Sequence, residues 1–438
     1  MEERWSTEHV LSLAPDTSSQ KAAGKLSSSA PWSGTGTDGT ALWGECKGSG
    51  STPYRTVIEL ATPAYQCSCP SRKFPCKHAL GLLLLWSGTP EAVPEAAEAA
   101  DWAADWLQAR TERAEKAAEK RASAEPADPE AARRRAARRG ARVAAGAAEL
   151  RLRLADRVRH GLADQATAGP WEEVAARMVD AQAPGLATRV RELDALPQER
   201  LLEEYAMLHL LATAATRVDE LPAELAATVR SRVGYTLDAS EVLAGLTVRD
   251  RWLVLGSRDS SDERLTTRRL WLRGAKTGRH ALLLAFGRPG QAPELALPTG
   301  HLLEADLAFH PGAHPLRAAL GTRYGAPEPG PAGAPAGLAV AEAVAGYGTA
   351  VAEDPWLESR PTVLSEVVPV RAPDGWHLTD GHHTVPVRAS AVPEAALWRL
   401  AAVSTGRPLT VFGEYGHQGF APVTAWAADH RPVGLTNL

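Results

Sequence analysis

The spacing of hydrophobic residues changes several times along the 438 residues and predicts different elements in successive segments. In residues 41–46 and 54–60 the composition favours strands, and a Gly- and Ser-containing turn separates them, so we expect a β-hairpin. Residues 79–86 are almost wholly apolar and predict a short buried helix. Together these segments predict a ββα unit. Around it we expect helical packing over residues 5–28 and a loop over residues 32–39.

A helical period dominates the middle of the chain. Residues 101–121 predict a helix, whereas residues 123–130 contain Pro126 and Pro129 and predict a flexible linker. Residues 131–162 predict one long helix, because apolar side chains recur in them at helical spacing. These side chains are Val143, Ala147, Leu150, Leu154 and Val158. Helical sequence continues to about Leu243.

Near Thr247 the hydrophobic period changes and predicts antiparallel strands. The first group of strands covers residues 252–255, 268–273 and 280–286. A Pro-, Gly- and Ala-rich interruption follows, and the last hundred residues predict a second β-rich unit. Its expected strands include residues 376–378, 384–387 and 409–412.

The predicted fold class is α+β with several domains, because 438 residues exceed the size of one ordinary core. The expected order is a small ββα unit, a helix with a linker, an α-helical domain with a basic first helix, and two β-rich units. The corresponding residues are 1–90, 91–130, 131–245, 246–324 and 338–438.

Composition and charge narrow the function classes. The hydrophobic fraction of 44% is typical of a globular protein, and the net charge of −4 provides no general attraction to nucleic acid. The longest apolar stretch, residues 79–86, is too short to span a bilayer. The first residues carry charge and no apolar run, so we expect no membrane association and a cytoplasmic location.

Four side chains that can bind a metal lie within twelve residues: Cys67, Cys69, Cys76 and His78. Three thiolates and one imidazole suit tetrahedral Zn²⁺, and a full set of four leaves no position for a substrate. In an extended segment Cys67 and Cys69 point to the same side. Cys76 and His78 cannot both lie in mid-helix, so we expect Cys76 before the helix, His78 in its first turn and Lys77 facing solvent. The spacing predicts one closed, structural zinc site.

The pattern Cys-x-Cys, six residues, Cys-x-His, between a hairpin and an apolar helix, resembles the SWIM zinc finger. The flanks Trp43-Gly44-Glu45-Cys46 and Gly48-Ser49-Gly50 also resemble bacterial SWIM proteins, and the resemblance covers roughly residues 5–90. It implies that Cys67, Cys69, Cys76 and His78 are the zinc ligands. It also implies a binding module for DNA or protein. Bacterial members are associated with MoxR-type AAA+ ATPases, von Willebrand A-domain (VWA) proteins and SNF2-type helicases, so such machinery is the expected partner class.

Two alternatives concern the cysteines. A disulfide between Cys67 and Cys69 would close a very tight and strained loop, so redox-active or inert thiols are the less favoured interpretation. Cys46 is the fourth cysteine of the chain. It is expected to be a buried structural residue, although a place near the metal or a role as replacement ligand stays open.

Basic residues offer a second hypothesis, direct DNA binding. Near the cysteines the candidate contacts are Arg72, Lys73 and Lys77. In the long helix they are Arg133, Arg134, Arg135, Arg138, Arg139 and Arg142. Such a stripe could follow a phosphate backbone. A solvated face, or one paired within the chain, is the more common outcome for a charge run.

Nothing in the sequence supports an enzyme, which stays a distant third hypothesis. No nucleotide-binding glycine loop, nucleophile elbow or His-Glu-x-x-His motif is found. A cluster around the Asp380-Gly381 turn contains His377, His382 and His383. A two-residue hairpin would place His377 near Thr384, and the histidines would then face opposite sides of the sheet. We therefore expect a non-catalytic adaptor.

Overall fold

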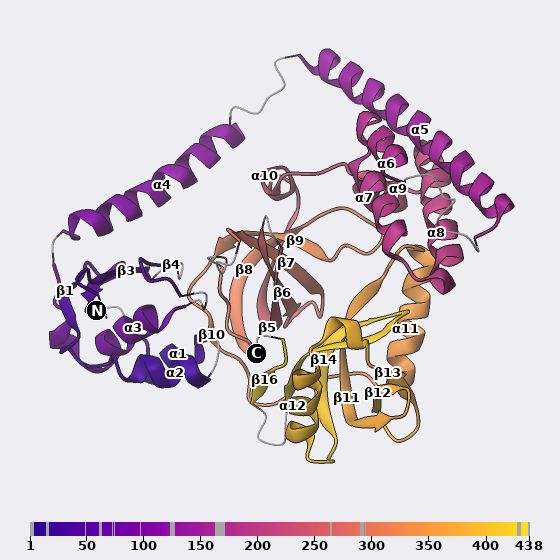
Figure 1. Cartoon of the computed structure of the whole chain (residues 1–438). Helices are drawn as coiled ribbons and strands as arrows, with labels where there is room; N and C mark the ends of the chain where they lie inside the picture. Colours follow the sequence, from indigo (N-terminus) through magenta and orange to yellow (C-terminus); the bar gives the residue numbers. More distant parts are fainter. Residues whose placement is uncertain are drawn as a thin grey trace.

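A computed structural model of the chain describes most residues and shows a zinc-finger unit, a helical bundle and two β-barrels (Figure 1). The described residues are 4–14, 17–48, 50–60, 64–71, 73, 75–96, 98–122, 128–162, 171–262, 265–289, 293, 295–426 and 431–436. Among the described helices, none combines the length and the apolar composition that a membrane span requires.

The first unit is a four-stranded antiparallel sheet with helices on both faces. Its helices and strands are α1 (Thr7–Ser12), α2 (Thr17–Gly24), β1 (Trp32–Thr37), β2 (Ala41–Cys46), β3 (Tyr54–Glu59), β4 (Ala64–Cys67), α3 (Lys77–Gly88) and α4 (Asp101–Ala122). Side chains alternate between the two sides of a strand, so Leu42 and Ile58 pack against α3, whereas Trp43 and Val57 pack against α4.

The β2–β3 hairpin, the helices within residues 5–28 and helix α4 agree with the sequence patterns. The expected ββα unit is nevertheless too small, because β1 and β4 extend the hairpin to four strands. Residues 32–39 contain a strand where a loop is expected. The small residues of β1 have a packing role, since a Cβ at Gly36 would lie 2.7 Å from the Trp43 ring.

The middle of the chain is helical, as expected. Its elements are α5 (Pro129–His160), α6 (Trp171–Asp180), α7 (Pro184–Glu192), α8 (Gln198–Thr216), α9 (Ala223–Val233) and α10 (Ala239–Leu243). Val143, Ala147, Leu150 and Leu154 of α5 enter one apolar core with α6–α9. Val158, which recurs at the same spacing, lies in the last turn of α5 and is 42% exposed. The expected linker over residues 123–130 falls mostly outside the described residues.

Five strands then close into a first barrel: β5 (Thr247–Ser261), β6 (Thr266–Gly274), β7 (His280–Gly287), β8 (His301–Phe309) and β9 (Arg317–Arg323). The strands pair in the order β5-β6-β7-β9-β8, and β8 pairs again with β5. All pairs are antiparallel except β7–β9, which is parallel. The short β10 (Glu328–Pro329) adds to the edge of β8.

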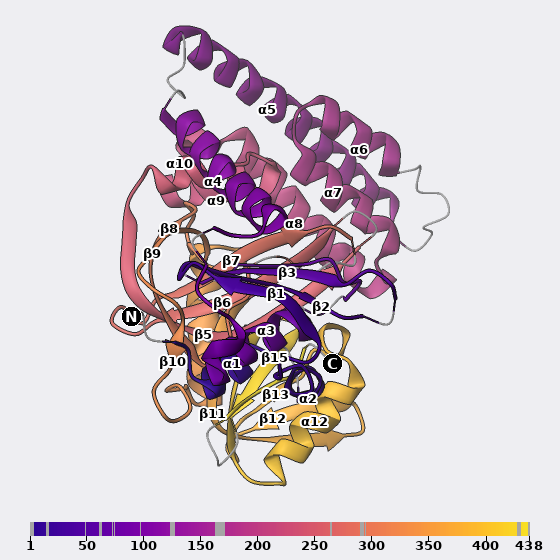
Figure 2. The same ribbon diagram turned by 90° about the vertical axis from the view of Figure 1, so that its left-hand side faces the viewer.

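The last hundred residues form a second, smaller barrel. Its elements are α11 (Val340–Glu353), β11 (Ser359–Ala372), β12 (Gly375–Thr379), β13 (Thr384–Pro386), α12 (Glu394–Ser404), β14 (Leu409–Gly416), β15 (Gly419–Trp426) and β16 (Pro432–Gly434). The two barrels share an apolar layer in which Leu255 and Trp271 of the first meet Phe412 and Val423 of the second. The finger and the bundle lie on opposite sides of the first barrel (Figure 1), and Figure 2 shows the finger sheet in front of it.

Candidate metal centre

The four metal-binding side chains come from two elements that meet at one end of the finger. β4 ends at Cys67, and Cys69 follows in the extended segment after it. Cys76 is the N-cap of α3, and His78 lies in its first turn. Lys77 between them is exposed. The expected positions of Cys76, Lys77 and His78 relative to the helix are confirmed.

The ligand atoms of Cys67, Cys69, Cys76 and His78 all lie within 4.8 Å of one another. The His78 Nδ1 atom faces the Cys67 sulfur at 3.7 Å. Two contacts fix the sulfur positions: the Thr56 hydroxyl donates to Cys67 Sγ (3.3 Å), and the Ala79 N–H donates to Cys76 Sγ (3.4 Å). A tetrahedral Zn²⁺ accepts this donor set, and all four positions are then filled by protein.

The surroundings close the cluster on its inner side. Cys76 and His78 are buried, and Leu82 and Leu85 behind them are fully buried in the finger core. On the outer side the Tyr54 ring lies 4.8 Å from the His78 ring. A site whose four ligands all come from the protein is typical of structural zinc.

The three thiols do not ionise alike. Hydrogen bonds from Cys67 and Cys76 lower the pKa of Cys69, so this sulfur is the first to become a thiolate. The hydrogen bond with Cys69 raises the pKa of Cys67 to about 11. Thiolates are the form that binds zinc. Zinc binding at the cluster is therefore coupled to the loss of thiol protons.

Cys46 lies outside this group. Its side chain is fully buried at the end of β2, its Sγ faces the Lys47 carbonyl at 3.9 Å, and burial raises its pKa. In the described part of the chain the metal-binding group contains only the other three cysteines and His78. This position agrees with a buried structural cysteine.

A pocket of about 390 Å³ opens beside the cluster. Cys69 and His78 form part of its wall, and Lys73 and Lys77 contribute cations. Its other lining residues are Ser18, Ser19, Ala22, Tyr54, Pro70 and Ser71. The Lys73 ammonium donates to the Ser18 hydroxyl (3.1 Å), which ties the cysteine loop to α2. Sequence patterns do not point to Ser18 or Ser19, because the fold alone brings α2 to the cysteines.

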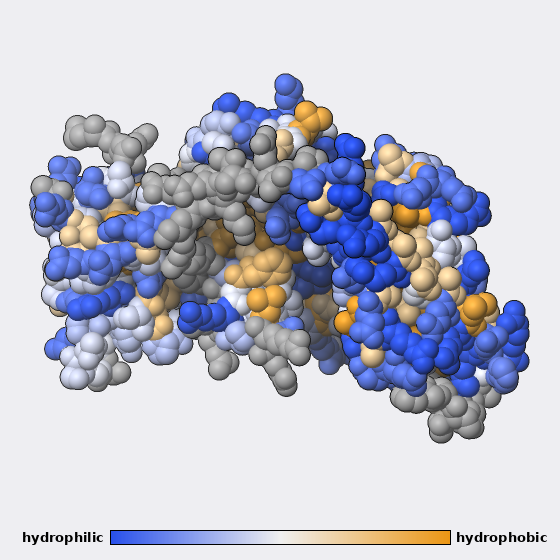
Figure 3. All heavy atoms as spheres, turned by 90° about the horizontal axis from the view of Figure 1, so that it is seen from above, coloured by the Kyte–Doolittle hydropathy of each residue, from blue (hydrophilic) through white to orange (hydrophobic). Residues whose placement is uncertain are grey.

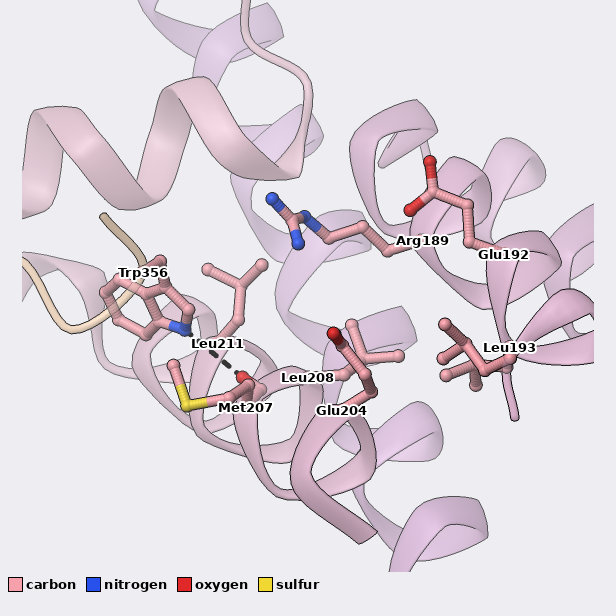
Figure 4. Close-up of a pocket in the computed structure, with 9 residues that line it drawn as sticks. Arg189, Glu192, Leu193, Glu204, Met207, Leu208, Leu211 and Trp356 are labelled. Atoms are coloured by element: carbon pink, nitrogen blue, oxygen red, sulfur yellow. Dashed lines mark hydrogen bonds between the residues drawn. The ribbon is translucent and has the colours of Figure 1, made fainter. Parts of the chain in front are cut away.

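A smaller cavity of about 70 Å³ lies between α7 and α8 and is closed by Trp356 (Figure 4). Trp356 follows α11, far along the chain, yet its side chain belongs to the core of the bundle. Its indole N–H donates to the Met207 carbonyl (3.1 Å). The nearby ion pairs Arg189–Glu358 (3.0 Å) and Arg232–Asp354 (3.5 Å) join the same two regions. The cavity is therefore part of a junction between the bundle and the second barrel.

The candidate nucleic-acid contacts separate into two groups. In α5, Arg139 donates to the Gly234 carbonyl (3.1 Å) and stacks on the Tyr235 ring, and Arg142 donates to Gln182 (2.7 Å). Near the start of α5, Arg133, Arg134, Arg135 and Arg138 are exposed, and Arg134 pairs with Glu130 (3.4 Å). Figure 3 shows a mainly hydrophilic surface over the bundle. Lys73 and Lys77 lie at the finger pocket, whereas Arg72 lies outside the described residues.

The histidine cluster near Asp380 has a different register from the expected one. His377 pairs with Pro386 and Thr379 with Thr384, so four residues form the turn where two are expected. Asp380 accepts the backbone N–H groups of His382 and His383, which stabilises this wider turn. Within the described ranges these histidines form no group of three or more metal-binding side chains.

Comparison with known proteins agrees with this geometry. Residues 54–86 match the SWIM zinc finger family, and residues 138–233 match the SWIM-associated four-helix bundle domain. Neither the curated proteins nor the solved structures contain a match to the chain. A SWIM finger with a Cys₃His cluster within ligating distance supports one structural zinc ion. The chain therefore contains a SWIM zinc finger followed by the four-helix bundle domain that is associated with it.

Proposed function

We propose that this protein is a non-catalytic interaction module whose zinc finger presents a basic pocket to a protein partner. The observation that carries the proposal is the pocket of about 390 Å³ beside the metal cluster. Its volume suits a side chain or short segment of a partner. Lys73 and Lys77 line it, and no acidic residue does so among the described lining residues.

Cys67, Cys69, Cys76 and His78 are the proposed zinc ligands. The ion would fix the cysteine loop against the first turn of α3 and so hold the pocket wall in place. Binding free energy at a closed site of this kind is folding free energy, and no reaction at the metal is needed. The units expected over residues 1–90, 131–245, 246–324 and 338–438 would then display and support this surface.

The proposed partner class is the machinery suggested by the family resemblance, namely a MoxR-type AAA+ ATPase, a VWA protein or an SNF2-type helicase. A cytoplasmic location fits such partners. The pocket adds a chemical requirement, since its lysines favour an acidic segment on the partner. Charge complementarity of this kind steers association and selects among partners.

Direct DNA binding by the finger and α5 is the second candidate. Its support is the row of exposed arginines at positions 133, 134, 135 and 138. Two observations weigh against it. Arg139 and Arg142 are engaged within the chain, and residues 1–90 carry eight Lys and Arg against seven Asp and Glu, so the finger has little net charge.

The test is the binding of purified, zinc-loaded protein to each purified candidate partner, measured by biolayer interferometry. A Lys73→Glu/Lys77→Glu variant should weaken association at least about tenfold, because both pocket cations are reversed. Lys276→Glu is the matched control, since Lys276 is exposed in a turn of the first barrel. Equal affinity of the pocket variant and the control would overturn the proposed role of the pocket.

The salt dependence of binding, measured on the same preparations, distinguishes DNA binding from protein binding. A protein interface should tolerate moderate salt, whereas duplex binding through several arginines should fall steeply with it. Tight duplex binding that an Arg133→Glu/Arg135→Glu variant abolishes would favour the second candidate.

A further inference from the structure

Both barrels have the strand connectivity of an OB-fold. In the first barrel the third and fifth strands, β7 and β9, are parallel, and the first strand, β5, pairs with both the second and the fourth. In the second barrel β11 likewise pairs with β12 and β14. A parallel bridge between Val387 and Phe420 joins its third and fifth strands. Helix α12 lies between the third and fourth strands. In OB-folds ligands bind on the face of strands 2 and 3.

The corresponding face of the first barrel is formed by β6 and β7. Their inward side chains, such as Leu270 and Leu283, fill the barrel. Trp271 and Leu282 point outward and are covered by the second barrel. Farther along the same face, Arg269 is exposed and Phe286 is 53% exposed. Contact between the barrels therefore leaves one end of the ligand face open.

Arg258 lies opposite Arg269 on the neighbouring strand β5. Its Nε and Nη2 atoms are buried and have no hydrogen-bond partner among the described residues. Glu414 of the second barrel approaches Nη1 only to 4.0 Å. Arg388, which follows β13, lies close enough to act on Arg258 electrostatically. Arg258 therefore lies near two further arginines, Arg269 and Arg388, and Glu414 is the carboxylate that approaches it.

Elsewhere in the first barrel an exposed arginine stacks on an aromatic ring, and this pair serves as an internal comparison. Arg249 stacks on Tyr324 at 3.6 Å, but its guanidinium also donates to Glu304 (2.7 Å). The Tyr324 hydroxyl donates to Asp306 (2.7 Å). Both members of this pair are bound by carboxylates. Among the described residues, no such carboxylate contact holds Arg269.

From this arrangement we infer that the seam between the barrels, formed by Arg258, Arg269, Phe286 and Arg388, binds single-stranded nucleic acid. An exposed aromatic ring can stack on a base of any sequence, and neighbouring arginines can hold the phosphates on either side of that base. The bases of a duplex are already stacked and are not available to Phe286. The site needs neither the zinc pocket nor the arginines of α5, so it extends the proposed function to a second ligand.

The test uses the full-length, zinc-loaded protein with fluorescein-labelled dT20, U20 and a 20-base-pair duplex in anisotropy titrations. Phe286→Ala and Arg269→Glu change exposed residues and should leave the fold intact. Each should weaken single-strand binding at least about fivefold, in line with the loss of one stacked base or one phosphate contact. Tyr324→Ala and Arg251→Glu are the matched controls and should bind like wild type. Contact with three arginines predicts a slope of log affinity against log salt of about −2.

Binding of dT20 or U20 that the two seam variants weaken and the controls do not would support the inference, and comparison of the two strands tells DNA from RNA. Three outcomes would overturn it. These are no single-strand binding at 50 mM salt, equal binding by all variants, and a preference for duplex that depends on Arg133 and Arg135. Because zinc content and partner binding are measured separately, failure here leaves the proposed role of the finger intact.

Discussion

Cys46 and Cys76 are both buried in the finger, yet only Cys76 points into the metal-binding group. The difference is local. Cys76 caps α3 and is held by the Ala79 N–H, whereas Cys46 ends β2 and faces the Lys47 carbonyl. Both residues are cysteines, so residue type does not tell the metal ligand from the structural residue. The short spacing from Cys76 to His78 does.

Replacing Cys76 with Ser, or His78 with Ala, should remove the zinc and unfold the finger, because metal binding and folding are coupled at such sites. The zinc content measured by elemental mass spectrometry should fall from one ion per chain to none. Limited proteolysis should then cut within residues 1–90 and leave the barrels resistant.

Cys46→Ala is the matched control. It removes a buried thiol that is not in the metal-binding group, so one zinc per chain should remain. A His78→Ala protein whose finger resists protease as well as wild type would contradict a structural role for the metal.

The metal-binding residues could be predicted because they lie within twelve residues of one another. The pocket beside them could be predicted only in part. Lys73 and Lys77 belong to the same short segment, but Ser18 and Ser19 come from α2, and only the folded chain brings α2 to that place.

At the level of elements, hydrophobic spacing predicts the long helices and the strands with large alternating side chains. It does not predict β1, which is built from small residues that pack under Trp43. It also misses α11 and α12 inside a segment that otherwise has the composition of strands. The hairpin after β12 has a four-residue turn because Asp380 binds two backbone N–H groups, a contact that no spacing rule contains.

Strand β5 contains a position where the two barrels approach each other closely. A Cβ at Gly256 would lie 2.5 Å from the Thr424 hydroxyl oxygen and 2.7 Å from a Val423 methyl carbon. Gly256→Ala should therefore lower the free energy of unfolding by about 1–3 kcal/mol, as other overpacked core substitutions do. Calorimetry of the purified protein measures the change.

The same substitution at Gly140 should have the opposite effect on the free energy of unfolding. Gly140 lies within α5, and a Cβ there has no neighbour within 4 Å. Alanine should stabilise this helix by about 0.5–1 kcal/mol, because glycine loses more backbone entropy on folding. If Gly256→Ala were as stable as wild type, the close contact between β5 and β15 would be wrong.

At the level of the whole molecule, the closure of the barrels could not be predicted, because β7 and β9 form a parallel pair across a long stretch of chain. The division into 246–324 and 338–438 follows the composition, yet the two regions share the apolar layer around Trp271 and Phe412. Sequence patterns likewise do not place Trp356 in the bundle, since its neighbours in the chain belong to the second barrel.

Trp356→Ala should uncouple the bundle from the second barrel. Replacing a buried tryptophan with alanine typically lowers the free energy of unfolding by about 3–5 kcal/mol. We expect the bundle to melt at a lower temperature, as a separate calorimetric transition. Trp398→Ala is the control, because Trp398 is 49% exposed and should have a much smaller effect. A single unchanged transition in Trp356→Ala would contradict the junction.

The position of Trp356 also bears on how the protein folds during synthesis. Chains fold from the N-terminus as they leave the ribosome. The finger can complete its core early, because its residues all precede the bundle. The bundle cannot, because the Trp356 indole, one of its buried core residues, is made only after the entire first barrel. A nascent chain should therefore carry an incomplete core between α7 and α8 until Trp356 has been synthesised. Ribosome-bound chaperones that recognise exposed apolar surface would be able to bind there during that interval.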